Sequence, residues 1–275
     1  MSWITFKRSA AVVLSGGLFL GMASYGPQSA GSADASDRQE TDREPNADGD
    51  VHELMSWVLV STAGVSSVRV TGEMETQGYT VGHGHEVDRE GRCRKYMTFP
   101  DFGNVETVRV DDEVWVSPPT PYWLQAGGTE AVEMYQGMYV HGPVDDPDLA
   151  THADGCDVFS AFSLLDFGDE HNPAQMSLGP ETTYEGKRAI TVLIEEEEPE
   201  GSISSTLLVA AEGKPYPLHL TTEMVFVSPG PGTMVQRRAW HDYGGYFEVA
   251  VPPEAMSVAI SDMAPEHNPF PLTRW

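Results

Sequence analysis

The stretch VETVRVDDEVWVS, residues 105–117, decides the fold class. Val105–Val110 and Glu113–Ser117 are rich in β-branched and aromatic residues, which favour strands. Asp111 and Asp112 stand between these two runs, and aspartate is a residue type common in tight turns. The stretch therefore predicts two neighbouring antiparallel strands joined by a short turn.

Strand patterns continue on both sides of this hairpin. Leu218, Leu220, Met224 and Phe226 alternate with polar residues, which is the period of a half-buried strand. Residues 189–194 are almost continuously apolar, which is typical of a strand covered on both faces. Besides the hairpin and a strand around Val68–Met74, the predicted strands are Tyr79–Val87, Arg94–Phe99, Thr183–Tyr184, Ala189–Glu195, Ser205–Ala211, Tyr216–Phe226, Met234–His241 and Tyr246–Val249.

Helical spacing is confined to a few segments. Apolar residues recur at helical intervals in Val51–Ser61, with Asp50 as the candidate N-cap. Further helices are expected around Tyr122–Tyr135 and Phe159–Leu165. Because these helices are grouped and do not alternate with strands, we predict an α+β fold with a large antiparallel sheet. A sheet that curls around helices could enclose an apolar hollow, whereas a fully packed core is the alternative that this pattern leaves open.

The N-terminal region predicts export. Lys7 and Arg8 precede the apolar segment Ala10–Met22 and a run of small residues, the layout of a cleavable secretory signal; a buried N-terminal helix is the alternative. We therefore divide the chain into a signal peptide (1–35), a disordered acidic linker (36–50), a single domain (51–262) and a C-terminal tail (263–275). Residues 22–26 resemble a bacterial lipobox in which Tyr25 replaces the lipidated cysteine, so we expect a secreted or cell-envelope protein without a lipid anchor.

Net charge excludes several partners. The chain has 42 Asp and Glu residues against 16 Lys and Arg, a formal charge of −26 at pH 7. Nucleic acids and anionic membrane surfaces both require clustered cations. We therefore expect no nucleic-acid partner and, at most, transient membrane association.

The only two cysteines, Cys93 and Cys156, both lie in the exported part of the chain. An even number of cysteines in an oxidising compartment favours a disulfide bond, with two unpaired buried thiols as the alternative. No histidine adjoins either cysteine as a catalytic base, so nothing in the sequence supports a cysteine nucleophile.

Catalytic and metal-binding motifs are absent from the sequence. It contains no nucleophile elbow, zinc-protease helix, phosphate-binding loop or dinucleotide fingerprint. His83 and His85 are two residues apart on a predicted strand, so both face one way and could begin a metal site, but no third ligand is evident; exposed strand histidines are the alternative. We predict a protein that is not an enzyme and has no metal or cofactor.

Large apolar side chains are the candidates to line a hollow between sheet and helices. These candidate ligand-binding residues are Trp115, Tyr122, Trp123, Phe159, Phe162, Leu164 and Leu165. The alternative is that the same residues form an ordinary core.

Five short motifs together resemble a known group of proteins. They are Gly91–Cys93, Val108–Val116, Pro121–Trp123, Gly155–Asp157 and Leu208–Leu218. They are similar to segments of actinobacterial envelope lipoproteins, which resemble at fold level the LppX/LprG mycobacterial lipoproteins and the periplasmic carrier LolA. The similarity runs from about Ser66 to Pro252.

This resemblance implies a strongly curved antiparallel half-barrel whose concave side is closed by helices. It also implies that Cys93 pairs with Cys156, and it associates the fold with the carriage of acyl chains. The leading hypothesis is therefore the binding of an acyl or isoprenoid lipid between sheet and helices. The alternative is an envelope interaction or sensor module with a filled core and a protein partner, and a hydrolase is the third hypothesis. An internal volume above ~300 Å³ would favour the carrier.

Overall fold

The computed structural model describes residues 49–165, 167, 174–198, 201–227 and 232–270, and all of these residues belong to one compact unit. The predicted signal peptide and all of the predicted linker except Gly49 and Asp50 lie outside this range. None of the described helices is long and apolar enough to cross a membrane.

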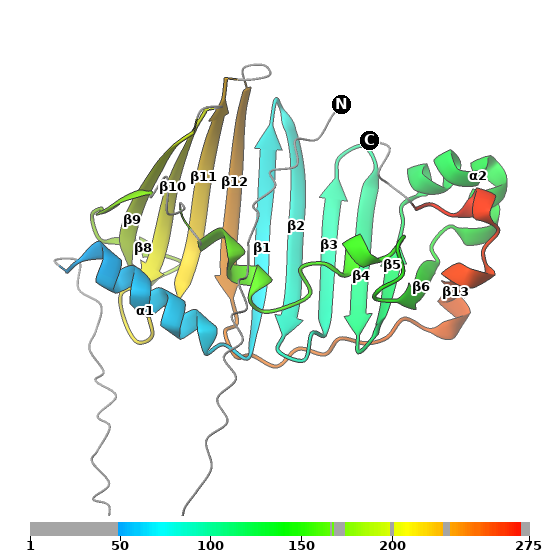
Figure 1. Ribbon diagram of the computed structural model, residues 1–275, viewed down its shortest axis with the longest axis horizontal. Coiled ribbons are helices and arrows are strands. Elements are labelled where there is room, and N and C mark those ends of the chain that lie inside the picture. Colours follow the sequence, from blue (N-terminus) through cyan, green and yellow to red (C-terminus); the bar gives the residue numbers. More distant parts are fainter. Residues whose placement is uncertain (1–48, 166, 168–173, 199–200, 228–231, 271–275) are drawn as a thin grey trace, which may run out of the picture. The chain divides into compact units, whose positions relative to one another are not determined.

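A single sheet of 13 strands forms the described domain (Figure 1). The strand order is β13-β6-β5-β4-β3-β2-β1-β12-β11-β10-β9-β7, and β8 also pairs with β9. All neighbours are antiparallel except β13 and β6. The strands are β1 (Ser67–Thr76), β2 (Tyr79–Asp88), β3 (Cys93–Phe99), β4 (Gly103–Val110), β5 (Glu113–Ser117), β6 (Tyr139–Pro143), β7 (Gln175–Leu178), β8 (Thr182–Tyr184), β9 (Lys187–Glu198), β10 (Gly201–Ala210), β11 (Pro217–Phe226), β12 (Gly232–His241) and β13 (Ser257–Ala259).

The large antiparallel sheet confirms the main part of the predicted fold class. The helices are few: α1 (Val51–Ala63), α2 (Thr120–Tyr135) and the four-residue α3 (Ala150–Ala153), with short 3₁₀ turns at η1 (Ser160–Leu165), η2 (Glu254–Met256), η3 (Ile260–Asp262) and η4 (Pro265–His267). The fold is therefore mostly β, where the sequence had predicted α+β. Residues 160–165 form a 3₁₀ turn and not an α-helix. Six residues are too few for a stable isolated helix, so packing against the sheet determines their conformation.

Helix α1 begins where the sequence predicts and extends two residues past the predicted Ser61. The Asp50 carboxylate accepts a hydrogen bond from the His52 amide at 2.8 Å, which satisfies one of the free N–H groups of the first turn. The helix ends at Gly64. Leu54, Met55 and Val58 are buried on one side of the helix, and Figure 1 shows α1 lying in front of the sheet near β8–β12.

Two hydrophobic cores lie on one face of the sheet, here called the inner face; the opposite face is the outer face. The inner face carries Val70, Trp240 and Ile190, and cross-strand pairing extends it to Val116 and Val140. The α1 core contains Leu54, Met55, Val58, Val65, Val68, Val70, Val87, Cys93, Cys156, Val158, Ala161, Phe162, Leu165, Ala174, Ile190, Val192, Ile194, Leu207, Val209, Ala211, Leu220 and Trp240. The α2 core contains Val105, Val114, Val116, Trp123, Ala131, Val140, Leu149, Ala153, Met263 and Phe270.

Two sequence-based expectations about the C-terminal part are wrong. The predicted strand Tyr246–Val249 is irregular backbone without a strand partner among the described residues, because the turn at 242–245 takes the chain away from the sheet. Residues 263–270 of the predicted tail belong to the domain, since Met263 and Phe270 are 7% and 2% exposed in the α2 core; residues 271–275 lie outside the described residues.

Candidate functional site

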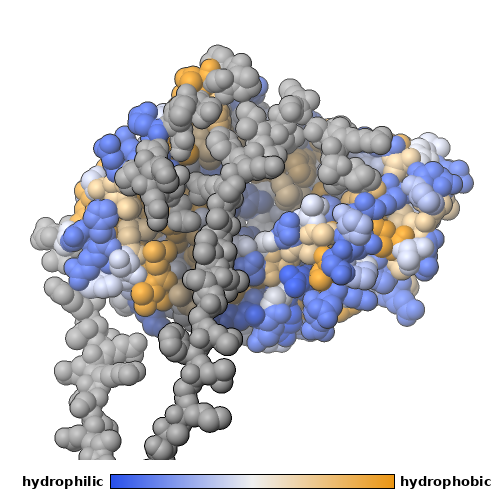
Figure 2. All heavy atoms as spheres, in the orientation of Figure 1, coloured by the Kyte–Doolittle hydropathy of each residue, from blue (hydrophilic) through white to orange (hydrophobic). Residues whose placement is uncertain are grey.

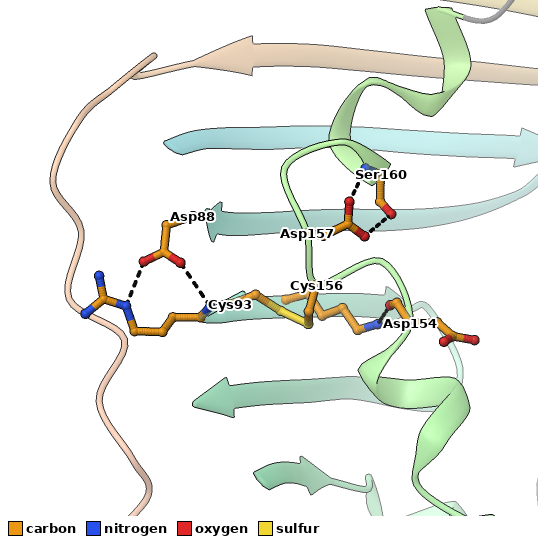
Figure 3. The surroundings of a disulfide bond; sticks show 8 residues. Asp88, Cys93, Asp154, Cys156, Asp157 and Ser160 are labelled. Atoms are coloured by element: carbon orange, nitrogen blue, oxygen red, sulfur yellow. Dashed lines mark hydrogen bonds and ion pairs between the residues drawn. A yellow bond between two sulfur atoms is a disulfide. The ribbon is translucent and has the colours of Figure 1, made fainter. Parts of the chain in front are cut away.

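A disulfide bond joins Cys93 in β3 to Cys156 (Figure 3). Both residues are buried, and their Cα atoms are 5.4 Å apart. This confirms the predicted pairing. The bond fastens the loop after α3 to the inner face of the sheet, because Cys93 points into the α1 core.

Polar contacts hold the same loop at several further points. The Lys95 ammonium donates to the Asp154 carbonyl at 2.5 Å. The Asp157 carboxylate accepts hydrogen bonds from the amide and the hydroxyl of Ser160 (Figure 3). The Trp240 indole N–H donates to the Ala161 carbonyl at 2.8 Å. Residues 154–161 are therefore held close to β3 and β12.

Four basic side chains lie next to one another on the inner face. We call Arg238 in β12, His83 and His85 in β2, and Lys95 in β3 the inner cationic cluster. Strand register brings them together: Gly72 of β1 pairs with Arg238 on one side and with His83 on the other. His85 pairs directly with Lys95. All four lie on the inner face because His85 and Trp240 both pair with the inner residue Val70.

Gly72 creates room for this arrangement. A Cβ atom at position 72 would lie 2.7 Å from His83 Nε2 and 2.3 Å from the Arg237 carbonyl oxygen. Contacts this short do not occur between non-bonded atoms, so any side chain at position 72 would displace the imidazole. The His83 ring therefore lies over the glycine of β1, on the side towards Arg238.

Burial sets the protonation of the cluster. Burial, followed by the charge of Arg238, lowers the pKa values of His83 and His85 to about 4. Burial also lowers the pKa of Lys95 to about 8 and that of Arg238 to about 10. At neutral pH the cluster therefore has two neutral imidazoles, a charged guanidinium and a predominantly charged ammonium.

Several nitrogen atoms of the cluster have no hydrogen-bond partner. Among the described residues, the Nε2 atoms of His83 and His85 and the Nε atom of Arg238 are buried and unpaired. The only hydrogen bond of the Arg238 guanidinium within the described chain is a long one of 3.5 Å to the Ala161 carbonyl. Buried polar groups are normally hydrogen-bonded, so this cluster offers unused donors to a ligand.

The two histidines share a face, as the sequence predicts, but they are half-buried. Within the residues that the structure describes, no group of three His, Cys, Asp or Glu side chains could hold a metal ion. Arg238 and Lys95 were not among the candidate site residues. The signal for Arg238 is the alternation in β12, which puts it on the same face as Trp240.

The seven predicted lining residues do not surround one hollow. Trp123 is buried in the α2 core with Tyr122 at its edge, whereas Phe162 and Leu165 are buried in the α1 core with Leu164 at its edge. Trp115 is buried on the outer face, where it stacks on His141 with ring centroids 5.9 Å apart. Phe159 is 71% exposed.

An open depression of about 710 Å³ lies elsewhere, beside β6 and the C-terminal turns. Glu113, Asp146 and Asp148 contribute carboxylates to its wall. Asp148 accepts a hydrogen bond from the Asn268 amide at 2.7 Å. None of the seven predicted lining residues borders this depression, although Met263 of the α2 core contributes to its wall.

Comparisons with known proteins show distant similarity at the level of the fold. No protein-family model matches the chain, and no curated protein matches its sequence. The crystal structure of MucB in complex with MucA(peri) has 15% identity and a TM-score of 0.33, covering 75% of this chain and 58% of that one. The complex structure of Pseudomonas aeruginosa MucA/MucB has 15% identity and a TM-score of 0.34, covering 74% and 59%.

A putative outer membrane lipoprotein-sorting protein domain from Vibrio parahaemolyticus has 9% identity and a TM-score of 0.24. It covers 74% of this chain and 95% of that domain. The chain spans about three fifths of the length of the MucB chains.

Proposed function

We propose that this chain is an exported, non-enzymatic binding protein for an acyl or isoprenoid lipid, held on the inner face of a half-barrel sheet that helices and loops partly cover. It is secreted or resides in the cell envelope without a lipid anchor. One observation carries the proposal: apolar side chains on the inner face remain partly open beyond the two packed cores. We call Met74, Met97, Ile203, Met224 and Met234 the inner apolar strip.

Strand register places the inner apolar strip on five strands. Met224 of β11 pairs with Met234 of β12 and with Ile203 of β10. Met97 of β3 pairs with His83, next to the inner cationic cluster. Met97 is 43% exposed, and the other four side chains are half-buried.

The composition of the strip suits an apolar chain. Methionine is unbranched and polarisable, so it adapts to ligands of irregular shape. Each CH₂ group of a ligand that is removed from water contributes ~0.8 kcal/mol, before the cost of ordering the chain. The strip therefore offers a hydrophobic surface without requiring a preformed cavity between the two cores.

The proposal is tested by native mass spectrometry of the purified, disulfide-bonded protein, with organic extraction of bound material. We expect an adduct of lipid mass and uptake of a fluorescent fatty acid. Met97→Glu should weaken uptake at least tenfold, because it places a charge in the strip. Thr98→Glu is the matched control, since the adjacent side chain is exposed on the outer face, and it should leave uptake unchanged.

The alternative is an envelope interaction module that contacts a protein through its surface. The packing of the predicted lining residues into two separate cores favours this alternative. A clean apo mass together with no uptake of the fluorescent fatty acid would reject the lipid proposal in favour of the module. Equal loss of uptake in Met97→Glu and Thr98→Glu would also contradict the inner apolar strip as the site.

A further inference from the structure

The basic side chains of the inner face differ from those on the outer face in their partners. Outer-face arginines form ion pairs across strands: Arg237 with Glu73 at 2.8 Å, and Arg94 with Glu106 at 2.6 Å. On the inner face, no carboxylate among the described residues lies within ion-pair distance of Arg238 or Lys95, although the Asp154 charge opposes the lowering of the Lys95 pKa. In a chain of net charge −26, a group of cations without carboxylate partners is not explained by composition.

Leaving these groups unpaired is unfavourable. Removing a cation from water costs several kcal/mol unless a partner compensates for the lost hydration. Within the part of the chain that the structure describes, Arg238 has a buried Nε–H without an acceptor, and His83 and His85 each have a buried Nε2 without a partner. An oxyanion at this position would supply acceptors for the guanidinium, which binds carboxylate and phosphate through paired N–H groups.

The position of the cluster relative to the inner apolar strip connects the two features. His83 lies between Gly72 and Met97 in the same cross-strand row. The His83 imidazole already covers Gly72, so a ligand head would lie against this ring and the Arg238 guanidinium, not directly over the glycine. Its chain could then continue over Met97 or over Met74, which pairs with Val81 on the same face.

We propose that Arg238, with His83 and His85, binds the anionic head group, a carboxylate or a phosphate, of an acyl-chain ligand whose tail lies on the inner apolar strip. This inference rests on the proposed function and adds the chemistry of the head group. Arg238 is the main contact through its charged guanidinium. Each neutral imidazole donates one hydrogen bond when the proton of its ring lies on the nitrogen that faces the anion. Lys95 contributes charge from the adjacent row while it remains bonded to the Asp154 carbonyl.

The test compares ligands that differ only in charge. Affinities are measured for dansyl-labelled undecanoic acid and its methyl ester, and for a monoacylglycerol phosphate and the matching monoacylglycerol. We expect the acid and the phosphate to bind at least tenfold more tightly than their neutral partners. Arg238→Gln should remove this preference while leaving the affinity for the neutral probes within about twofold.

Arg237→Gln is the matched control, because it removes an arginine from the adjacent, outer-facing position of the same strand. It should preserve the preference for the anionic probes. Arg238→Lys, which keeps the charge and loses the paired donors, should retain part of the preference. Near-UV circular dichroism of each variant checks that the fold is retained.

The outcomes separate this inference from the proposed function. Equal affinity of the acid and its ester in the unmodified protein would overturn the head-group site and leave lipid binding intact. Binding of none of the four probes would overturn both proposals. Binding of inorganic phosphate, detected through the His83 and His85 NMR signals, without binding of the lipid probes would also overturn the head-group site, in favour of a free anion.

Discussion

The two faces of the sheet from β12 to β4 differ in how their charged side chains are paired. On the outer face, arginines and carboxylates alternate and pair across strands, as in Arg69 with Glu86 at 2.7 Å. On the inner face, basic side chains gather between two apolar cores. Exposed ion pairs contribute little to stability, whereas unpaired buried cations destabilise the fold. The inner-face cations are therefore the destabilising feature, and destabilising local features are expected where function requires them.

Arg237 and Arg238 occupy adjacent positions of β12 and differ in their carboxylate partners. Arg237 has carboxylates at 2.8 and 3.6 Å, from Glu73 and Glu75. Arg238 has only a long contact with the Ala161 carbonyl among the described residues.

The largest effect is expected for Trp240, an inner-face residue that is 2% exposed. Trp240→Ala removes its packing against Phe162 and its hydrogen bond to the Ala161 carbonyl. We expect a loss of about 3–5 kcal/mol in the free energy of unfolding, measured by urea denaturation. The neighbouring outer-face variant His241→Ala loses one hydrogen bond to Thr71 and should lose about 1 kcal/mol. Equal losses would contradict the assignment of the faces.

Removal of the disulfide bond should cause the next largest loss of stability. Replacing Cys93 and Cys156 together by alanine releases a loop of sequence separation 63, which should lower the free energy of unfolding by about 3 kcal/mol. The denaturation midpoint in urea is compared with that of the unmodified protein. Hydrogen exchange of residues 154–161 should accelerate as well, because the loop loses its attachment to β3. An unchanged midpoint would show that the bond does not restrain the unfolded chain.

Acidification should destabilise the folded protein through His85 on the inner face. His85 has its pKa lowered to about 4 by burial and by Arg238, His83 and Lys95, against the opposing effect of Asp157. His85 is therefore protonated near pH 6.5 in the unfolded chain, but only near pH 4 in the folded chain. Stability should fall as pH decreases across this window, by at most about 1.4 kcal/mol per pH unit for this group.

The variant His85→Gln isolates that contribution. Its melting temperature should depend less steeply on pH between 6.5 and 4 than that of the unmodified protein. His241→Gln, on the outer face, is the control. If both variants and the unmodified protein show parallel pH profiles, His85 is not held neutral by burial.

The smallest changes in the free energy of unfolding are expected for replacing an arginine by methionine, and they should have opposite signs on the two faces. Arg238→Met should raise the free energy of unfolding by about 1 kcal/mol, because it removes a partly buried cation that has no carboxylate partner among the described residues. Arg237→Met should lower it by no more than about 0.5 kcal/mol, the contribution of an exposed ion pair. Calorimetric melting of both variants provides the measurement. A stability loss in Arg238→Met would contradict the unpaired state of this guanidinium.

Local patterns in the sequence predicted most of the sheet. Glu113–Ser117 forms β5 with the predicted bounds, since alternation and turn residues act within a few positions of each other. Tyr246–Val249 shows the limit of this reasoning, because a strand also needs a neighbour to pair with. Phe159 shows a second limit: hydrophobicity alone predicted a buried lining residue, but the loop leaves the side chain exposed.

Local patterns and residue counts were enough to predict the mostly antiparallel sheet, the helix that begins after Asp50 and the even pair of cysteines, because periodicity, capping and composition do not depend on distant parts of the chain. Only the tertiary structure placed His83 next to Arg238, which are 155 residues apart in the chain. Strand order brings β2 and β12 to opposite sides of β1, and the lack of a side chain at Gly72 lets the His83 imidazole lie over β1. No local pattern specifies which strands become neighbours, since that depends on how the whole sheet buries its two cores.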